Sequence, residues 1–394
     1  MSTQSPDPLR LIRVDQIGSL VRPAKLREVF ARYDRGQATD EELRRAQDDA
    51  IRDVIAKQEA HGLPLLTDGE FRRHNFQESF SASVAGFDVA KDVSLYFEQR
   101  EVNTRPLERA EQDFNAPGPA IVTRRGVVER LRLIRNQPLE EYRFSQGVAK
   151  RPVKVTLISP DRISQRFAWE KSQPIYKGLD DFVEDVVSIE RRMVSELVEA
   201  GCRYIQIDAP GYTAYVDQLS LERMRSRGED PDENLQRSIK ADNSVIEGFS
   251  GVTFGIHVCR GNARTIDPKT GKLISQWHRE GHYDAIAERL FNGLKHQRLL
   301  LEYDSERAGG FEPLRYVPKG KMVVLGLITT KESRLETVDE LKRRIDDAAR
   351  YLPLEQFALS PQCGFGGLES KVLSEDEQWQ KLDRMMETAR QVWR

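Results

Sequence analysis

Cysteine is scarce in this sequence, with three residues among 394. So few thiols exclude a disulfide scaffold, and an odd number suits a reducing compartment. Residues 1–10 also lack the apolar stretch of a signal peptide. Each cysteine therefore needs its own explanation, as a packing residue, a metal ligand or a nucleophile.

The sequence also lacks an excess of charge of one sign and a long hydrophobic run. Lys plus Arg number 61 and Asp plus Glu number 63, which gives a formal net charge of −2. This balance gives no reason to expect nucleic acid or an anionic membrane as a partner. Since no run approaches the roughly 18 apolar residues of a membrane helix, we expect a cytoplasmic protein. The sequence gives no indication of its oligomeric state.

Short apolar runs alternate with amphipathic stretches, which is typical of an α/β protein with a parallel sheet. Eight runs have the composition of buried parallel strands: Leu11–Ser19, Leu63–Glu70, Val153–Pro160, Tyr204–Pro210, Val252–Arg260, Leu299–Asp304, Met322–Thr329 and Phe357–Cys363. Helices are predicted over Asp40–His61, Leu179–Ala200, Asp284–Leu294, Leu335–Tyr351 and Ser374–Trp393. Eight strands predict a (β/α)₈ TIM barrel. The main competitor, a doubly wound sheet, is weakened in its nucleotide-binding forms because no GxGxxG or GxxxxGK[ST] motif follows the first strand.

The length suits one elaborated barrel, since such barrels need about 250 residues plus insertions. We therefore expect a single domain over residues 1–394 with an insertion at about 80–148, between the second and third strands. A small β-hairpin and helices beside the barrel mouth are expected there. Residues 261–282 are expected to form a long loop on the catalytic face, because turn signals such as Asp267-Pro268 interrupt them.

The sharpest local feature lies at the end of the fifth predicted strand, where His257 and Cys259 point to the same side. Imidazole and thiolate are both good zinc ligands, although the pair is also typical of core packing. Cys363 follows the eighth strand in a glycine-rich turn, where it is a ligand or a packing residue. Glu302 ends the sixth strand, and such a carboxylate is either a ligand or the partner of a base such as Arg307.

These four residues share the face where barrel enzymes place their sites, at the carboxyl ends of the strands. Two thiolates, an imidazole and a replaceable carboxylate would bind zinc, which lowers the pKa of a substrate thiol. Four protein ligands could also form a closed structural site, but the position at a barrel mouth favours catalysis. Cys202 precedes the fourth strand, at the opposite end, and is expected to be a packing residue.

Three further motifs end strands on the same face. The segment Ile17–Ser19 offers backbone and hydroxyl groups to an anionic ligand, or is a plain turn. Glu70 follows Asp68 in a DGE motif, and Asp208 begins a DAP motif. Their carboxylates could bind an ammonium group, anchor a loop or pair with a neighbouring arginine, because structural ion pairs are also common.

Together these motifs resemble the catalytic C-terminal barrel of cobalamin-independent methionine synthase, from Ile17 to the region after Cys363. The resemblance implies a (β/α)₈ barrel with four zinc ligands: His257, Cys259, Glu302 and Cys363. It implies that homocysteine is held at four further positions: Ile17, Ser19, Glu70 and Asp208. Ser19 would bind the carboxylate, the two acidic residues would bind the ammonium group, and zinc would hold the sulfur.

The sequence departs from that family in three respects. The full-length family has a second, N-terminal barrel, and its fourth strand usually reads Asp-Glu-Pro where this chain has Asp208-Ala209-Pro210. The family also carries a His after its seventh strand that helps to protonate the leaving folate, whereas residues 325–331 contain none. General acid help typically contributes about 10²-fold or more, so the resemblance does not assign folate as the donor.

We predict a zinc-dependent methyltransferase that converts homocysteine to methionine, with homocysteine and a methyl donor as its small-molecule partners. One alternative keeps the zinc thiolate but uses another thiol or electrophile, such as an epoxide. Another is a zinc hydrolase, in which metal-bound water is the nucleophile; two thiolates argue mildly against it because they lower the Lewis acidity of the metal. In a non-enzymatic alternative, zinc only stabilises the fold.

Overall fold

The structure is a computed structural model, and it describes residues 8–74, 76–88, 126–165, 167, 171–261, 264–266, 273–275, 279–366 and 373–393. Its largest sheet has six parallel strands in the order β10-β9-β8-β5-β4-β3. Their bounds are β3 Val155–Ile158, β4 Tyr204–Asp208, β5 Thr253–Val258, β8 Arg298–Glu302, β9 Met322–Ile328 and β10 Phe357–Pro361. Every residue of these strands is buried, which explains their nearly continuous apolar composition.

Isolated parallel bridges complete the ring of strands: Val14 with Leu359 of β10, Ser19 with Gly69, and Leu66 with Val153. Two N-terminal segments therefore take the places of the first two strands, and the fold is the predicted (β/α)₈ barrel rather than an open sheet. The predicted strands Leu11–Ser19 and Leu63–Glu70 are reduced to these bridges. The ladder cannot continue past Gly69, because Gly69 and Glu70 have φ angles of 70° and 57°, outside the extended region.

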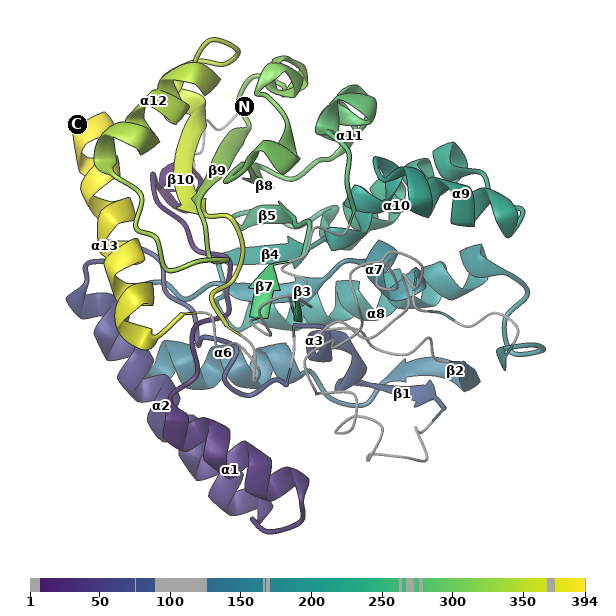
Figure 1. Cartoon of the computed structure of the whole chain (residues 1–394). Coiled ribbons are helices and arrows are strands. Elements are labelled where there is room, and N and C mark those ends of the chain that lie inside the picture. The colour runs from purple at the N-terminus through teal and green to yellow at the C-terminus, as the bar shows by residue number, and fades with distance from the viewer. Residues whose placement is uncertain are drawn as a thin grey trace.

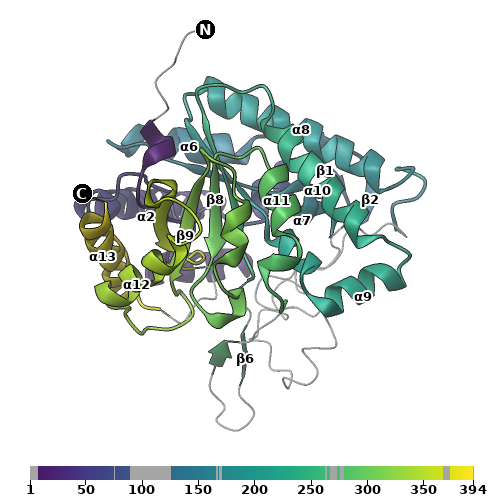
Figure 2. The same cartoon turned by 90° about the horizontal axis from the view of Figure 1, so that it is seen from above.

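Helices surround the strands (Figures 1 and 2). The α-helices are α1 Ala24–Asp34, α2 Asp40–Ala60, α3 Glu78–Ser81, α6 Gln137–Val148, α7 Pro160–Ser164, α8 Leu179–Glu199, α9 Gln218–Ser226, α10 Pro231–Ile246, α11 Ala287–Gly293, α12 Val338–Ala348 and α13 Glu375–Val392. Short 3₁₀ helices are η1 Pro8–Leu11, η3 Pro210–Tyr215, η4 Tyr283–Ala285, η5 Glu306–Ala308, η6 Glu312–Tyr316 and η7 Leu354–Gln356. All five predicted helices are present, with ends that differ by a few residues.

Local sequence explains where several of these helices begin. A capping box begins each of three helices: Thr39 forms it at the start of α2, Thr337 at α12 and Ser374 at α13. In this motif, side chains satisfy backbone N–H groups that the first turn leaves without partners. Within the described residues, no helix combines the length and the apolarity that crossing a bilayer would need.

The predicted insertion contains the expected hairpin, since β1 (Val84–Phe87) pairs antiparallel with β2 (Val127–Leu133). Helices α3 and α6 flank it, and residues 89–125 lie outside the described residues. The predicted loop at 261–282 contains a second antiparallel hairpin, β6 (Arg264–Ile266) with β7 (Leu273–Ser275), and most of its other residues also lie outside the described part. The single-domain organisation remains a prediction.

Candidate active site

Three of the predicted ligands converge at the carboxyl ends of β5 and β10. His257 lies in β5, Cys259 follows directly after it, and Cys363 follows β10. One ligand atom of each lies within 4.8 Å of the other two, and the two Sγ atoms are 3.3 Å apart. Because residues 259 and 363 are far apart in sequence, it is the closure of the barrel that brings their thiols together.

The donor atoms of this group suit a metal ion. Nδ1 of His257 lies 3.3 Å from the Leu300 carbonyl, which can only accept, so the proton belongs on Nδ1 and the lone pair on Nε2. That Nε2 is buried and has no hydrogen-bond partner among the described residues. A backbone contact that fixes the other ring nitrogen is typical of ligating histidines. Two thiols and an imidazole are a donor set that zinc prefers.

The two thiols differ in acidity. The hydrogen bond with Cys363 holds the pKa of Cys259 well below its ordinary value, and His257 adds to this effect although burial opposes it. The backbone N–H of Gly261 also donates to the Cys259 sulfur, at 3.1 Å. The contact between the two sulfurs, together with burial, raises the pKa of Cys363. The two neighbouring sulfurs share one proton, and a metal cation bound between them would take the place of that proton.

Glu302, the fourth predicted ligand, ends β8 but does not belong to this close group. Its Oε1 accepts a hydrogen bond from Lys331 at 2.8 Å, and its Oε2 accepts one from the backbone N–H of Arg260 at 3.0 Å. Arg307 is 3.9 Å from Oε1, so the ion pair considered as an alternative is also present. Lys331 in turn contacts Asp304 at 2.9 Å. Lys331 was not singled out from the sequence: its place shortly after the apolar strand β9 puts it at the carboxyl end of the barrel, but does not indicate which acid it contacts.

The two carboxylates predicted to bind an ammonium group are both buried, and Asp208 lies beside one residue of the candidate metal group. The pKa of Asp208 is raised to about 7, chiefly by burial; the negative charge of Glu70 also raises it, whereas His257 lowers it. Asp208 pairs with His257 in the β4–β5 register. A buried carboxylate that lies near the negative charge of a second one is a favourable place for a cationic group.

The Ile17–Ser19 segment contacts both sides of this site. A β-carbon at Gly18 would lie 2.8 Å from Oε1 of Glu70, so only glycine allows this close approach. The Ser19 carbonyl accepts a hydrogen bond from the backbone N–H of Phe365 at 2.9 Å. This contact ties the segment to the loop that carries Cys363.

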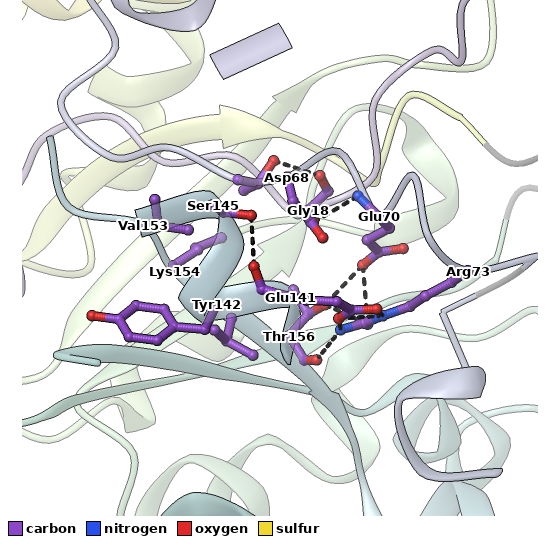
Figure 3. A pocket seen from close by; sticks show the side chains of 12 residues that line it. Gly18, Asp68, Glu70, Arg73, Glu141, Tyr142, Ser145, Val153, Lys154 and Thr156 are labelled. Atoms are coloured by element: carbon purple, nitrogen blue, oxygen red, sulfur yellow. Dashed lines mark hydrogen bonds and ion pairs between the residues drawn. The ribbon is translucent and has the colours of Figure 1, made fainter. Parts of the chain in front are cut away.

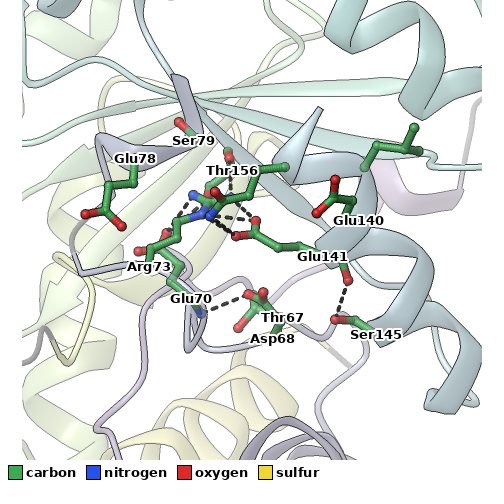
Figure 4. A network of polar contacts seen from close by, with 12 residues as sticks. Thr67, Asp68, Glu70, Arg73, Glu78, Ser79, Glu140, Glu141, Ser145 and Thr156 are labelled. Carbon is green, nitrogen blue, oxygen red and sulfur yellow. Dashed lines mark hydrogen bonds and ion pairs between the residues drawn. The ribbon is translucent and has the colours of Figure 1, made fainter. Parts of the chain in front are cut away.

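Glu70 belongs to a buried polar network between residues 67–73, β3 and α6 (Figure 4). Its Oε1 accepts a hydrogen bond from Thr156 at 2.8 Å, and Arg73 donates to Thr156 and, through two nitrogens, to Glu141. A cavity of about 10 Å³ adjoins this network and is lined by Gly18, Asp68, Glu70 and Thr156 among others (Figure 3). It has room for about one water molecule.

Cys202 lies at the amino end of the barrel, just before β4, as expected from its place in the sequence. Its side chain is fully buried, and its sulfur contacts the Tyr204 carbonyl at 3.4 Å. Burial raises the pKa of this thiol to about 12. A thiol of this kind is inert at neutral pH.

A (β/α)₈ barrel with thiols, an imidazole and carboxylates at its carboxyl end has the architecture of a barrel enzyme. The pattern of the family described as "Cobalamin-independent synthase, Catalytic domain" matches residues 13–266 and 299–391. The chain belongs to this family, which confirms the resemblance inferred from its motifs.

Individual relatives are similar along almost their whole length. The Bacillus subtilis protein YxjG is 34% identical over 389 residues, covering 97% of this chain and 95% of that protein. A methionine synthase of Sulfurisphaera tokodaii is 25% identical over 368 residues, covering 93% and 89%.

Solved structures share the fold. A Listeria monocytogenes protein named as a vitamin-B12-independent methionine synthase aligns with a TM-score of 0.72 and 23% identity, covering 97% of this chain and 98% of that one. A B12-independent methionine synthase from Shewanella sp. W3-18-1, in complex with selenomethionine, aligns with a TM-score of 0.70 and 20% identity, with the same coverage.

Proposed function

We propose that this protein is a zinc-dependent methyltransferase that transfers a methyl group to the thiol of homocysteine and forms methionine. The observation that carries this proposal is the convergence of His257, Cys259 and Cys363 within 4.8 Å at the barrel mouth, beside two buried carboxylates. The family and the relatives named methionine synthase support it. The Shewanella structure was solved with selenomethionine, a close analogue of the proposed product.

In this proposal, His257, Cys259 and Cys363 would hold the zinc, with Glu302 next to them as the fourth predicted ligand. When bound by such a set, zinc lowers the pKa of a coordinated thiol and keeps it nucleophilic at neutral pH. Two thiols among the ligands favour activation of a thiol over the alternative hydrolase chemistry, because thiolates reduce the Lewis acidity that hydrolysis needs.

The remaining predicted residues would fix the amino-acid end of homocysteine. Ser19 and the backbone at Ile17 would bind its carboxylate end, and Glu70 and Asp208 would bind its ammonium group. Holding both ends of the substrate orients the sulfur toward the incoming methyl group, which is a large source of rate enhancement. The sulfur–methyl bond forms as the bond between the methyl group and its donor breaks.

X-ray absorption at the zinc edge tests the proposal directly. The purified zinc-loaded protein is measured with and without L-homocysteine, and one additional sulfur neighbour is expected with the thiol. Unchanged zinc ligation would contradict thiol activation and leave the hydrolase or the structural role. Methionine formation is then measured with methyl-folate and methyl-corrinoid donors in parallel, because residues 325–331 contain no His to assist a folate.

A further inference from the structure

Glu70 and Asp208 are each held by a neutral side chain that is itself fixed by a buried cation. For Glu70 the neutral residue is Thr156: its hydroxyl donates to Glu70 Oε1 at 2.8 Å and accepts from Arg73 at 2.9 Å. Figure 4 shows Arg73, Thr156 and Glu70 in contact. Thr156 is buried in β3, so this chain of contacts is inside the protein.

For Asp208 the neutral residue is Gln206, two positions earlier in β4. Its Nε2 donates to Asp208 Oδ1 at 2.6 Å and to the Ile17 carbonyl at 2.7 Å. Its Oε1 accepts from Lys154 at 2.7 Å. One buried amide therefore fixes both a predicted ammonium-binding carboxylate and the backbone of the first predicted substrate-binding segment.

The direction of these hydrogen bonds is determined by the two cations. Arginine and lysine side chains can only donate. The Thr156 hydroxyl must therefore accept from Arg73 and has its single proton left for Glu70. In the same way Gln206 must turn its oxygen toward Lys154, so that its NH₂ group faces Asp208. Neither neutral residue can reverse without leaving a buried donor or acceptor unpaired, which costs free energy.

Each cation has another acid as its direct partner. Arg73 binds Glu141 through Nε and Nη2, and Lys154 binds Asp15 at 2.8 Å. Arg73 Nη1 is 3.8 Å from Glu70 Oε1, too far for a hydrogen bond. The cations therefore orient Glu70 and Asp208 through neutral groups and form no hydrogen bond to either carboxylate, so the carboxylates keep acceptor capacity for a cationic ligand.

We propose that Thr156 and Gln206 are positioning residues that orient Glu70 and Asp208 toward the α-ammonium group of the substrate. They would make the site selective for α-amino thiols over thiols that lack this group. This inference rests on the proposed function, because it takes the two carboxylates as the ammonium-binding groups.

The test compares two thiols that differ only in the amino group, L-homocysteine and 4-sulfanylbutanoate. Dissociation constants are measured by calorimetry on the zinc-loaded wild type, Thr156→Val and Gln206→Met. The wild type is expected to prefer homocysteine. Each variant is expected to lose roughly ten- to a hundredfold of that preference, the size of a hydrogen bond to a charged group. With an active methyl donor, KM for homocysteine should rise far more than kcat falls.

Two matched variants separate positioning from general damage. Thr156→Ser keeps the hydroxyl and should keep the wild-type preference. Thr388→Val removes a buried hydroxyl in α13 that bonds to the Arg384 carbonyl at 2.8 Å, and should change neither thiol's affinity. Zinc content should be the same in all variants, since none of these side chains belongs to the ligand group.

The outcomes distinguish this inference from the proposed function. A wild type that binds neither thiol would refute the proposed function and this inference with it. A wild type that prefers homocysteine, with Thr156→Val and Gln206→Met keeping the same preference, would refute the inference alone. An equal loss of affinity for both thiols in these variants would also refute the inference, because that result indicates a structural role.

Discussion

The folded protein should lose stability as Asp242 ionises toward neutral pH, and replacing Asp242 by Asn should abolish this loss. Asp242 is fully buried in α10, and its carboxyl group accepts hydrogen bonds from Tyr212 at 2.5 Å and Ser159 at 2.9 Å. Its pKa is raised from 3.8 to about 7, chiefly by burial; Asp161 also raises the pKa, whereas the Tyr212 hydrogen bond lowers it. The folded state therefore binds a proton that the unfolded state releases between these two pKa values.

The sign follows from linkage. A carboxyl group with a raised pKa in the folded state contributes stability at low pH, and this contribution is lost as the pH rises toward and through about 7. With these two pKa values, the linkage relation gives a loss of about 2 kcal/mol between about pH 5.5 and about pH 8. Asparagine has no proton to release. The substitution also changes the hydrogen bonds at this position, but that effect on the free energy of unfolding should be the same at every pH.

Urea unfolding of wild type and Asp242→Asn at these two pH values measures the effect. The free energy of unfolding of the variant, relative to wild type, should increase by about 2 kcal/mol from the lower to the higher pH. Asp347→Asn, at a partly exposed position in α12, is the control and should show no such change. A relative change below about 0.5 kcal/mol for Asp242→Asn, the usual size of a surface effect, would refute the reasoning.

Three further predictions concern the site and its support. Cys363→Ser should lower the affinity for zinc by more than the roughly 10- to 100-fold that loss of a supporting partner costs, and should lose the metal. Cys202→Ser should keep full zinc stoichiometry. Full zinc in Cys363→Ser, measured by elemental analysis, would contradict the ligand assignment. Gly364→Ala should raise KM for homocysteine and leave zinc content unchanged, because its β-carbon would overlap Oγ of Ser19; an unchanged KM would mean that Ser19 does not bind substrate. Glu141→Ala should lower the free energy of unfolding by about 3–5 kcal/mol, since it leaves its buried arginine partner without its acid; a loss below about 1 kcal/mol in urea unfolding would show that the pair is not buried as described.

The sequence predicted six strands closely because they are buried on both faces. The run predicted as Met322–Thr329, for example, is β9 from Met322 to Ile328. The first two strands could not be predicted as bridges, because their lengths depend on backbone angles. Glu70 takes a positive φ of 57° because Asp68 accepts its N–H at 2.8 Å and Arg22 donates to its carbonyl at 2.7 Å. Nothing in the apolar pattern of that run indicates this turn.

The candidate metal group was predictable because the positions of its members depend on where the strands end. The i and i+2 spacing of His257 and Cys259, together with the place of Cys363 after the last strand, requires only that the barrel closes. The contact between Glu302 and Lys331 was not predictable, since it depends on how the loop after β9 folds back over β8. The same limit applies to Thr156, whose role depends on a hydroxyl that faces a carboxylate from a different segment.

Gln206 did carry a signal, because it is a polar residue inside the buried strand YIQID and shares a face with Asp208. Below it in the barrel lie Lys154 and Asp15, both with fully buried side chains. A buried ion pair adds little stability compared with apolar residues of the same size. Lys154 can only donate hydrogen bonds, so its contact with Gln206 fixes which end of the Gln206 amide faces Asp208. If the proposed function holds, this buried ion pair would therefore serve the orientation of the Gln206 amide under Asp208 rather than the stability of the barrel.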